Sequence, residues 1–134
     1  MKISAKGRYA VRVMVDIANF GTEYVSISEI AQRQNISNKY LEKVIACLLK
    51  AKLLISMRGQ NGGYKLSKLP KEYSIAEILN VTKDTPNLAT CFENDCPMKD
   101  KCSTVGCWSA LTDIINDYLT KVTLQDLLDK TYNK

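Results

Sequence analysis

The sequence predicts a mainly α-helical protein with a small β-wing, namely a winged helix-turn-helix followed by a long C-terminal dimerisation helix. Three observations lead to this prediction: three amphipathic segments occupy the first 50 residues, a glycine-rich hairpin follows them, and another apolar stripe appears after residue 107. We assign residues 1–70 to the winged helix-turn-helix, 71–107 to a short helix and a cysteine-bearing loop, and 108–134 to the dimerisation helix and tail.

The first three helices are marked by apolar spacing and by start signals. Apolar residues recur every three to four positions over residues 5–20, and Gly21 supplies a stop. Ser26 and Glu29 fit a capping box that begins a second helix, ending near Gln34. Ser37 is a good N-cap for a third helix. The short connection between the second and third helices is typical of a helix-turn-helix.

The segments after residue 53 complete the fold. Residues 54–57 and 63–66 alternate as short strands do, and they flank a turn, 58–63, rich in residues that tolerate positive φ. A second capping box at Ser74 predicts a short helix to about Val81, and residues 84–107 have the composition of a loop. From Trp108 a longer helix is expected, with the apolar stripe Leu111, Ile114, Ile115, Tyr118, Leu119 and Val122.

Charge is distributed unevenly between the two halves of the chain. Residues 1–69 hold 12 basic and 4 acidic residues, a net charge of +8, whereas residues 70–134 hold 7 and 10, a net charge of −3. A basic first half suggests that it faces a polyanion, although a randomly basic surface would look the same. The chain has no run of 18 apolar residues and no signal-peptide pattern at its start, so we expect a cytoplasmic protein with no membrane partner.

Together these features favour double-stranded DNA as the partner. In a helix-turn-helix the N-terminal part of the third helix reaches base edges in the major groove, and an arginine at the base of a wing can enter the minor groove. An ordinary solvated helix face or a plain β-turn would carry similar residues, but the combination with the basic half favours DNA. The candidate DNA contacts are Ser37, Asn38, Lys39, Tyr40, Glu42, Lys43, Arg58, Gly59 and Gly62.

Five cysteines form the second candidate site. Cys47 lies among apolar residues of the third helix, where a small buried hydrophobe is expected. The other four crowd into 17 positions: Cys91, Cys96, Cys102 and Cys107. Disulfides are rare in the cytoplasm, and the gaps are wider than those of common zinc sites, so an iron–sulfur cluster is favoured. Zinc, redox-active thiols and incidental cysteines remain the alternatives.

Three motifs resemble those of the IscR/NsrR/CymR family of bacterial winged-helix regulators: Lys6-Gly7-Arg8-Tyr9-Ala10, Ile36-Ser37 with Tyr40-Leu41-Glu42, and Arg58-Gly-x-x-Gly-Gly-Tyr64. The resemblance extends from residue 1 to about residue 130. It implies a homodimer whose long C-terminal helices pair and which binds partly palindromic operators. By the same resemblance Ser37, Lys39, Glu42 and Arg58 would be DNA contacts.

The cysteine loop is most similar to that of the IscR-like members, which implies that Cys91, Cys96 and Cys102 ligate an iron–sulfur cluster. We expect a 2Fe–2S rather than a 4Fe–4S cluster. The chain departs from the pattern because it contains no histidine, and Val105 stands where those members place one. NsrR-like members use an N-terminal aspartate, but Arg8 stands at that position here. The candidates for the fourth ligand are Cys107, Glu93 or Asp95, a group of the partner subunit, or an exchangeable thiol.

Three functions follow as hypotheses. The first is a dimeric regulator that senses iron–sulfur cluster status and controls cluster-assembly genes. The second is a nitric-oxide-responsive or redox- or cysteine-responsive repressor of the same family, although the resemblance implies that CymR-like members lack the cysteine triad. The third, a small iron–sulfur electron carrier or zinc protein, leaves the wing and the basic half unexplained. We expect no enzyme, because the chain has neither a histidine for base chemistry nor a phosphate-binding lysine loop.

Overall fold

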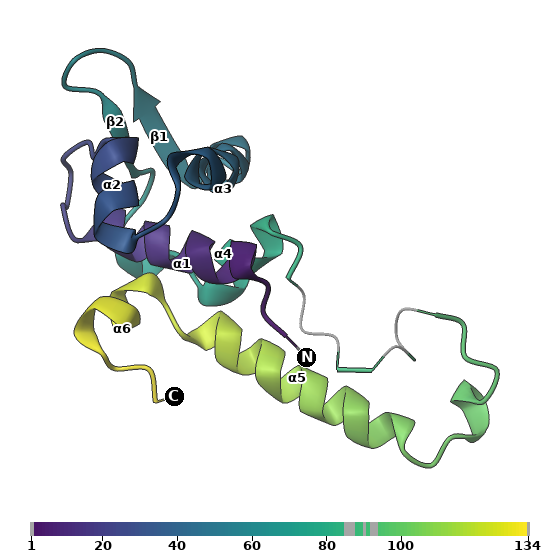
Figure 1. Ribbon diagram of the computed structural model, residues 1–134. Coiled ribbons are helices and arrows are strands. Elements are labelled where there is room, and N and C mark those ends of the chain that lie inside the picture. The colour runs from purple at the N-terminus through teal and green to yellow at the C-terminus, as the bar shows by residue number, and fades with distance from the viewer. Residues whose placement is uncertain (1, 85–87, 90, 92–93, 134) are drawn as a thin grey trace.

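The computed structural model describes residues 2–84, 88–89, 91 and 94–133. Its elements are, in order, α1 (Ala5–Ala18), α2 (Ile27–Gln34), α3 (Asn38–Lys50), β1 (Leu54–Met57), β2 (Gly63–Leu66), η1 (Pro70–Glu72), α4 (Ile75–Val81), η3 (Lys99–Lys101), α5 (Val105–Lys121) and α6 (Leu124–Asp129). This helical fold with one two-stranded wing confirms the predicted fold class (Figure 1). No helix within these ranges has both the length and the hydropathy needed to cross a membrane.

Hydroxyl side chains begin most of the helices. In α1, α2, α3, α4 and α6 the N-cap oxygen accepts a hydrogen bond from the backbone N–H three residues later; the caps are Ser4, Ser26, Ser37, Ser74 and Thr123. The carboxylate of Glu29 returns a bond to the backbone of Ser26 and completes the predicted capping box. Each cap of this kind stabilises its helix by about 1 kcal/mol. The helix starts predicted at Ser26, Ser37 and Ser74 are thus confirmed.

Helix α1 lies at the centre of the core. Its residues Ala10, Val13, Met14 and Ile17 are fully buried, and the helix contacts α2, α3, α4, α6 and β2. Tyr73 is fully buried as well. Its hydroxyl donates to the carbonyl of Leu53 at 2.8 Å and accepts from the backbone N–H groups of Ser67 and Lys68. Because these bonds join both strand ends to the segment leading into α4, Tyr73 fixes the wing relative to the rest of the fold.

The wing is an antiparallel hairpin held at both strands. Its register runs from Leu54 opposite Leu66 to Met57 opposite Gly63. Val25, just before α2, extends the pairing through two backbone bonds with Tyr64, 2.9 and 2.8 Å long. The wing is therefore anchored to the start of α2 as well as to the end of α3.

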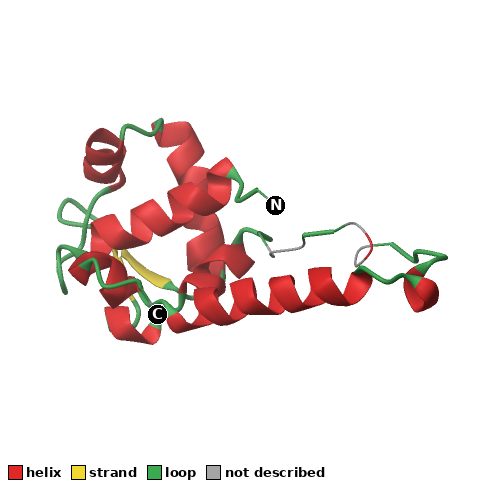
Figure 2. Ribbon diagram, turned by 90° about the horizontal axis from the view of Figure 1, so that it is seen from below, coloured by secondary structure: helices red, strands yellow, loops and turns green. Residues whose placement is uncertain are grey.

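Helix α5 projects from the body, and the loop between α4 and α5 lies at its far end (Figures 1 and 2). The C-terminal part of α5 lies against the body (Figure 1), where Tyr118 shares a groove with Ile75 and Leu79 of α4, and Val122 after the helix is buried. The helix begins at Val105, three residues before the predicted start at Trp108. The predicted loop of residues 84–107 includes Gly106, but a glycine costs a helix only about 1 kcal/mol, and the N–H groups of the first turn have no intrahelical partners to lose.

Candidate DNA interface and cysteine loop

The exposed face of α3 carries charged and polar side chains that are available for a ligand. Asn38, Lys39, Glu42 and Lys43 are all exposed, while Leu41, Val44, Ile45 and Leu48 on the other face are buried. Within the described part of the chain, the charged members of this face form no ion pair. Ser37 accepts a hydrogen bond from the backbone N–H of Tyr40 at 3.2 Å, so it has the capping role that the sequence predicts.

Tyr40 differs from its neighbours on α3 because it is half-buried. Its ring meets that of Tyr9 of α1 edge-on, with the ring centroids 5.4 Å apart. The guanidinium of Arg12 lies over the ring of Tyr9, 5.2 Å from its centroid. These contacts connect α1 to the N-terminal part of α3 and hold the start of that helix in place.

A polar link joins α1 to α2, and it was not predicted from the sequence. Asp16 is only 3% exposed, and its carboxylate accepts from Arg33 at 2.7 Å and from Gln34 at 2.8 Å. Arg12 donates to the side chain and to the backbone carbonyl of Gln34. The hydrogen bond with Asp16 raises the pKa of Arg33 further above its ordinary value. A charged residue inside the apolar stripe of residues 13–17 was the available signal of a buried ion pair.

The wing residues Arg58, Gly59 and Gly62 share one groove with the start of α2 and with Leu49 of α3. Arg58 follows the last residue of β1 and is exposed. A Cβ on Gly62 would lie 2.2 Å from the carbonyl oxygen of Met57, so only glycine fits this tight tip. The structure thus brings the three predicted wing residues together. The predicted residues at α3 form a separate exposed face, except for Tyr40, which is half-buried.

The five cysteines are free thiols at two separate places in the fold. Cys47 is half-buried rather than buried, because it lies on the edge of α3 beside a cleft lined also by Lys6, Lys50 and Lys83. The prediction of a buried small hydrophobe at position 47 was therefore wrong. Cys91, Cys96 and Cys102 are half-buried in the segment joining α4 to α5, which we call the cysteine loop.

Cys102 is placed directly before the N-terminus of α5. Its sulfur lies 3.2 Å from the hydroxyl of Thr104, and this hydrogen bond, with further bonds from the backbone of Thr104 and Val105, lowers the pKa of the Cys102 thiol. A helix N-terminus favours a negative charge, and the thiolate is the form of cysteine that binds soft metals. The local geometry therefore prepares Cys102 for ligation.

Cys107 lies inside the first turn of α5 and is exposed. Cys102 precedes α5 in extended conformation, so Cys102 and Cys107 do not lie on one helix. Of the carboxylates considered as a fourth ligand, Asp95 is exposed and Glu93 lies outside the described residues.

The cysteine loop fits a soft metal group by the chemistry of its donors. Among the described residues, no three cysteine, histidine or acidic side chains are already gathered as a metal site. Three half-buried thiols within 12 positions are nevertheless the donor type that iron–sulfur clusters and thiophilic ions take.

The stem of the cysteine loop is tied to the N-terminus of α1 by Asp84. Its carboxylate accepts from the backbone N–H of Ser4 at 2.9 Å, from the Ser4 hydroxyl at 2.6 Å and from the Thr82 hydroxyl at 2.7 Å. A Cβ on Gly7 would lie 2.2 Å from this carboxylate, which explains a glycine in the first turn of α1. Partial burial alone would raise the pKa of Asp84, but the bonds from Ser4 and Thr82 lower it overall.

We expect an Asp84→Asn variant to be less stable at pH 7 by about 1–2 kcal/mol, because it loses charge-assisted hydrogen bonds. The folded-state pKa of Asp84 is depressed, so its stabilisation is present above the unfolded-state pKa of about 3.9 and is lost as the pH falls through the folded value. Urea unfolding from pH 7 to pH 2.5 should show that the free energies of unfolding of the wild type and the variant converge in acid. Asp113→Asn, at an exposed position of α5, is the control. A difference that stays constant with pH would contradict the assignment.

Comparison with known proteins agrees with this geometry. Residues 3–130 match the model of the Rrf2 family, described as an iron-dependent transcriptional regulator. An HTH-type transcriptional regulator of Neisseria meningitidis is 38% identical over 99% of this chain and 91% of its own. IscR of Pectobacterium carotovorum is 35% identical over 96% of this chain and 80% of its own.

Two solved structures have the same fold over almost the whole chain. CymR, the global cysteine regulator of Bacillus subtilis, superposes with a TM-score of 0.82 at 32% identity, covering 98% of both chains. T. potens IscR gives 0.77 at 36% identity, covering 97% of this chain and 88% of its own. The resemblance found in the motifs is confirmed, and the chain belongs to the Rrf2 family of DNA-binding transcription regulators, which are not enzymes.

Proposed function

We propose that this regulator binds operator DNA as a homodimer and responds to the state of an iron–sulfur cluster held by its cysteine loop. The observation that carries the proposal is the presence of two features in one chain: an exposed polar face on α3 together with an arginine-bearing wing, and three half-buried thiols in a loop. The targets that we propose are genes of iron–sulfur cluster assembly, by analogy with the IscR relatives.

On the DNA side, the N-terminal part of α3 would enter the major groove, with Ser37, Asn38, Lys39, Tyr40, Glu42 and Lys43 as the contact set. The charges of Lys39 and Lys43 suit phosphate or guanine, and a carboxylate such as Glu42 suits a cytosine amine. The wing residues Arg58, Gly59 and Gly62 would lie along the minor groove, where the negative potential of DNA favours arginine.

On the sensing side, Cys91, Cys96 and Cys102 would hold the cluster, preferably 2Fe–2S. When bound, the cluster would supply a centre that is sensitive to oxidation, and its presence or absence would report the availability of clusters. The protein contributes the thiolate-favouring position of Cys102 at the start of α5. It also contributes the Asp84 contacts, which join the base of the loop to α1 and hence to Tyr9 and the start of α3.

The dimer is supported by the apolar surface of α5. This helix contains no buried residue, and it exposes four large hydrophobic side chains: Trp108, Leu111, Ile114 and Tyr118. A projecting helix that exposes such a stripe requires a partner to bury it. Sedimentation at micromolar concentration should therefore give twice the mass of one chain.

Two measurements test the proposal as a whole. Affinity for duplex DNA should fall steeply between 50 and 200 mM salt, as expected for about six or more phosphate contacts. Purification without oxygen, followed by absorbance and by iron and sulfide counts, should reveal the cluster. A colourless protein that carries zinc would refute the cluster and leave the DNA function standing. Salt-independent binding would refute the DNA interface instead.

We expect Glu42→Ala to relax sequence choice more than it weakens non-specific binding, because a carboxylate repels phosphates unless a base donates to it. The ratio of affinities for a duplex selected from a random pool and for its scrambled version should fall by about tenfold, the cost of losing one base contact. Lys50→Ala, at the exposed C-terminal end of α3 and outside the contact set, is the control and should change the affinity for both duplexes alike. An equal loss on both duplexes for Glu42→Ala would contradict its role.

A further inference from the structure

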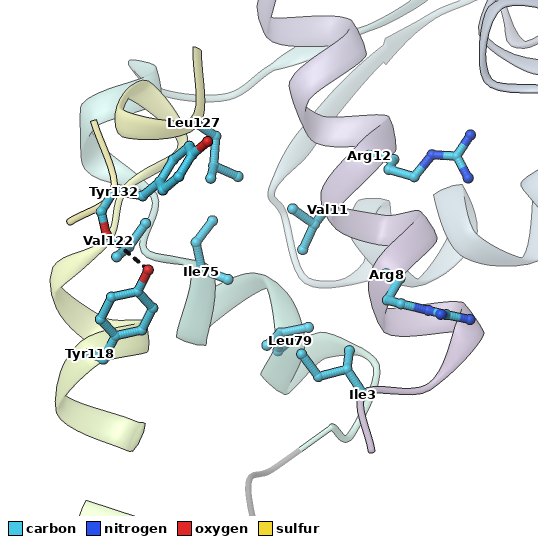
Figure 3. Close-up of a pocket in the computed structure, with 10 residues that line it drawn as sticks. All are labelled: Ile3, Arg8, Val11, Arg12, Ile75, Leu79, Tyr118, Val122, Leu127 and Tyr132. Carbon is cyan, nitrogen blue, oxygen red and sulfur yellow. Dashed lines mark hydrogen bonds between the residues drawn. The ribbon is translucent and has the colours of Figure 1, made fainter. Parts of the chain in front are cut away.

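An apolar groove of about 380 Å³ opens where the C-terminal end of α5 meets the body. Figure 3 shows side chains from α1, α4, α5 and the C-terminal segment around it. Its apolar lining includes Ile3, Val11, Leu79, Tyr118, Val122 and Leu127. Arg8 and Arg12 of α1 also line it. The hydroxyl of Tyr118 donates to the carbonyl of Tyr132 at 2.9 Å, which holds one wall in place.

The order of the apolar residues along α5 suggests what fills this groove. Four apolar residues of α5 follow one another at intervals of three, four and three positions, so they are placed symmetrically about residue 113: Trp108, Leu111, Ile115 and Tyr118. In an antiparallel pair of identical helices centred on that residue, Leu111 lies opposite Ile115, and Trp108 lies opposite Tyr118 of the other copy. Since Tyr118 is a wall of the groove, Trp108 of the second copy arrives at its opening.

We propose that the groove is the seat for Trp108 of a second copy of this chain, so that each subunit completes an apolar site on the other. The inference rests on the dimer proposed above and assigns its contacts. The site is reciprocal, because a two-fold axis through the middle of α5 places one tryptophan in each of the two grooves.

The exposed area of α5 supports a contact beyond simple helix pairing. Four apolar side chains of this helix are 40–65% exposed: Trp108, Leu111, Ile114 and Tyr118. Because a large side chain has an area of about 200 Å², their exposed parts together present about 400 Å² of apolar surface. A stable interface buries about 800 Å² on each partner, so the stripe alone supplies about half of it. The adjoining groove is the apolar surface next to the stripe, because Tyr118 belongs to both.

The apolar lining of the groove suits a large side chain such as an indole. Arg8 and Arg12 contribute the aliphatic stems of their side chains to the lining, whereas their guanidinium groups point away from it (Figure 3), and that of Arg12 is bound to Gln34. Arg12 already lies over the ring of Tyr9, which packs against Tyr40 of α3. The groove is thus lined by a residue that contacts the aromatic pair at the start of α3.

Two variants separate this inference from dimerisation by helix pairing alone. Trp108→Ala removes the occupant, and Val11→Glu places a charge in the groove on half-buried Val11 of α1. Each should raise the dimer dissociation constant at least about 30-fold, as loss of a central aromatic contact does. Asp113→Ala, on the face of α5 opposite the stripe, is the matched control and should leave the constant unchanged. Circular dichroism checks that each chain folds.

Mixing the two defective proteins provides the deciding measurement. The heterodimer has one intact contact, in which Trp108 of the Val11→Glu chain enters the open groove of the Trp108→Ala chain, whereas neither homodimer has any. Fluorescence transfer between labelled chains should therefore show a heterodimer that is tighter than either homodimer. A wild-type monomer would overturn both the dimer and this inference. A dimer that tolerates Val11→Glu, or variants that fail to complement each other, would overturn the groove assignment alone.

Discussion

Replacing Cys102 by alanine should yield a protein that retains little of the iron and sulfide present in the wild type after purification without oxygen. Cys102 lies near the N-terminus of α5, and the hydrogen bonds from Thr104 and Val105 lower the pKa of its thiol, so its thiolate is readily available as a ligand. Two remaining thiolates cannot hold a cluster that needs about four ligands. Iron and sulfide counts with the visible absorbance spectrum measure the effect.

The other cysteines provide the controls for this experiment. Cys47→Ala should retain the full cluster content, because Cys47 lies on α3, apart from the loop. Cys107→Ala tests the fourth ligand directly: a loss comparable with that of Cys102→Ala would assign Cys107, and an unchanged content would point to a carboxylate, a partner group or an exchangeable thiol. Unchanged iron and sulfide in Cys102→Ala would refute the proposed ligand set.

The fold was predictable because its signals are local. Capping hydroxyls at Ser26, Ser37 and Ser74 and the glycine-rich turn after Met57 depend on residues within a few positions of each other, and the structure has them as expected. The exact start of α5 was harder to predict. A glycine such as Gly106 disfavours a helix, but an exposed first turn tolerates it, so the helix begins three residues before the predicted start.

The links between elements were not predictable, because they join residues far apart in the sequence. Asp84 meets Ser4 across 80 positions, and Asp16 meets Arg33 across 17. In each case the sequence shows only an isolated polar residue, and its partner becomes apparent once the helices are packed. The groove on α1 belongs to the same class: its lining comes from both ends of the chain, so no single segment carries its pattern.

The largest effect on DNA binding is expected from Arg58→Ala, which should weaken binding to a selected duplex by roughly 10- to 100-fold, equivalent to about 1–3 kcal/mol. Arg58 is exposed at the end of β1, and the wing that carries it is fixed by the Val25–Tyr64 bridge and by the Tyr73 hydroxyl. The backbone that carries Arg58 therefore needs little ordering on binding, so the cost of placing the guanidinium in the minor groove is limited to its own side chain.

Lys71→Ala separates this contact from a general loss of positive charge. Lys71 is exposed in η1, outside the wing and α3, and its replacement removes the same unit of charge. Fluorescence anisotropy at fixed salt should show the large loss for Arg58→Ala and a change of less than about threefold for Lys71→Ala, because exposed charges beyond the Debye length of about 10 Å are screened. Equal losses for both variants would mean that Arg58 acts through net charge alone. In that case the specific DNA contacts would reside in α3, with the wing only supporting it.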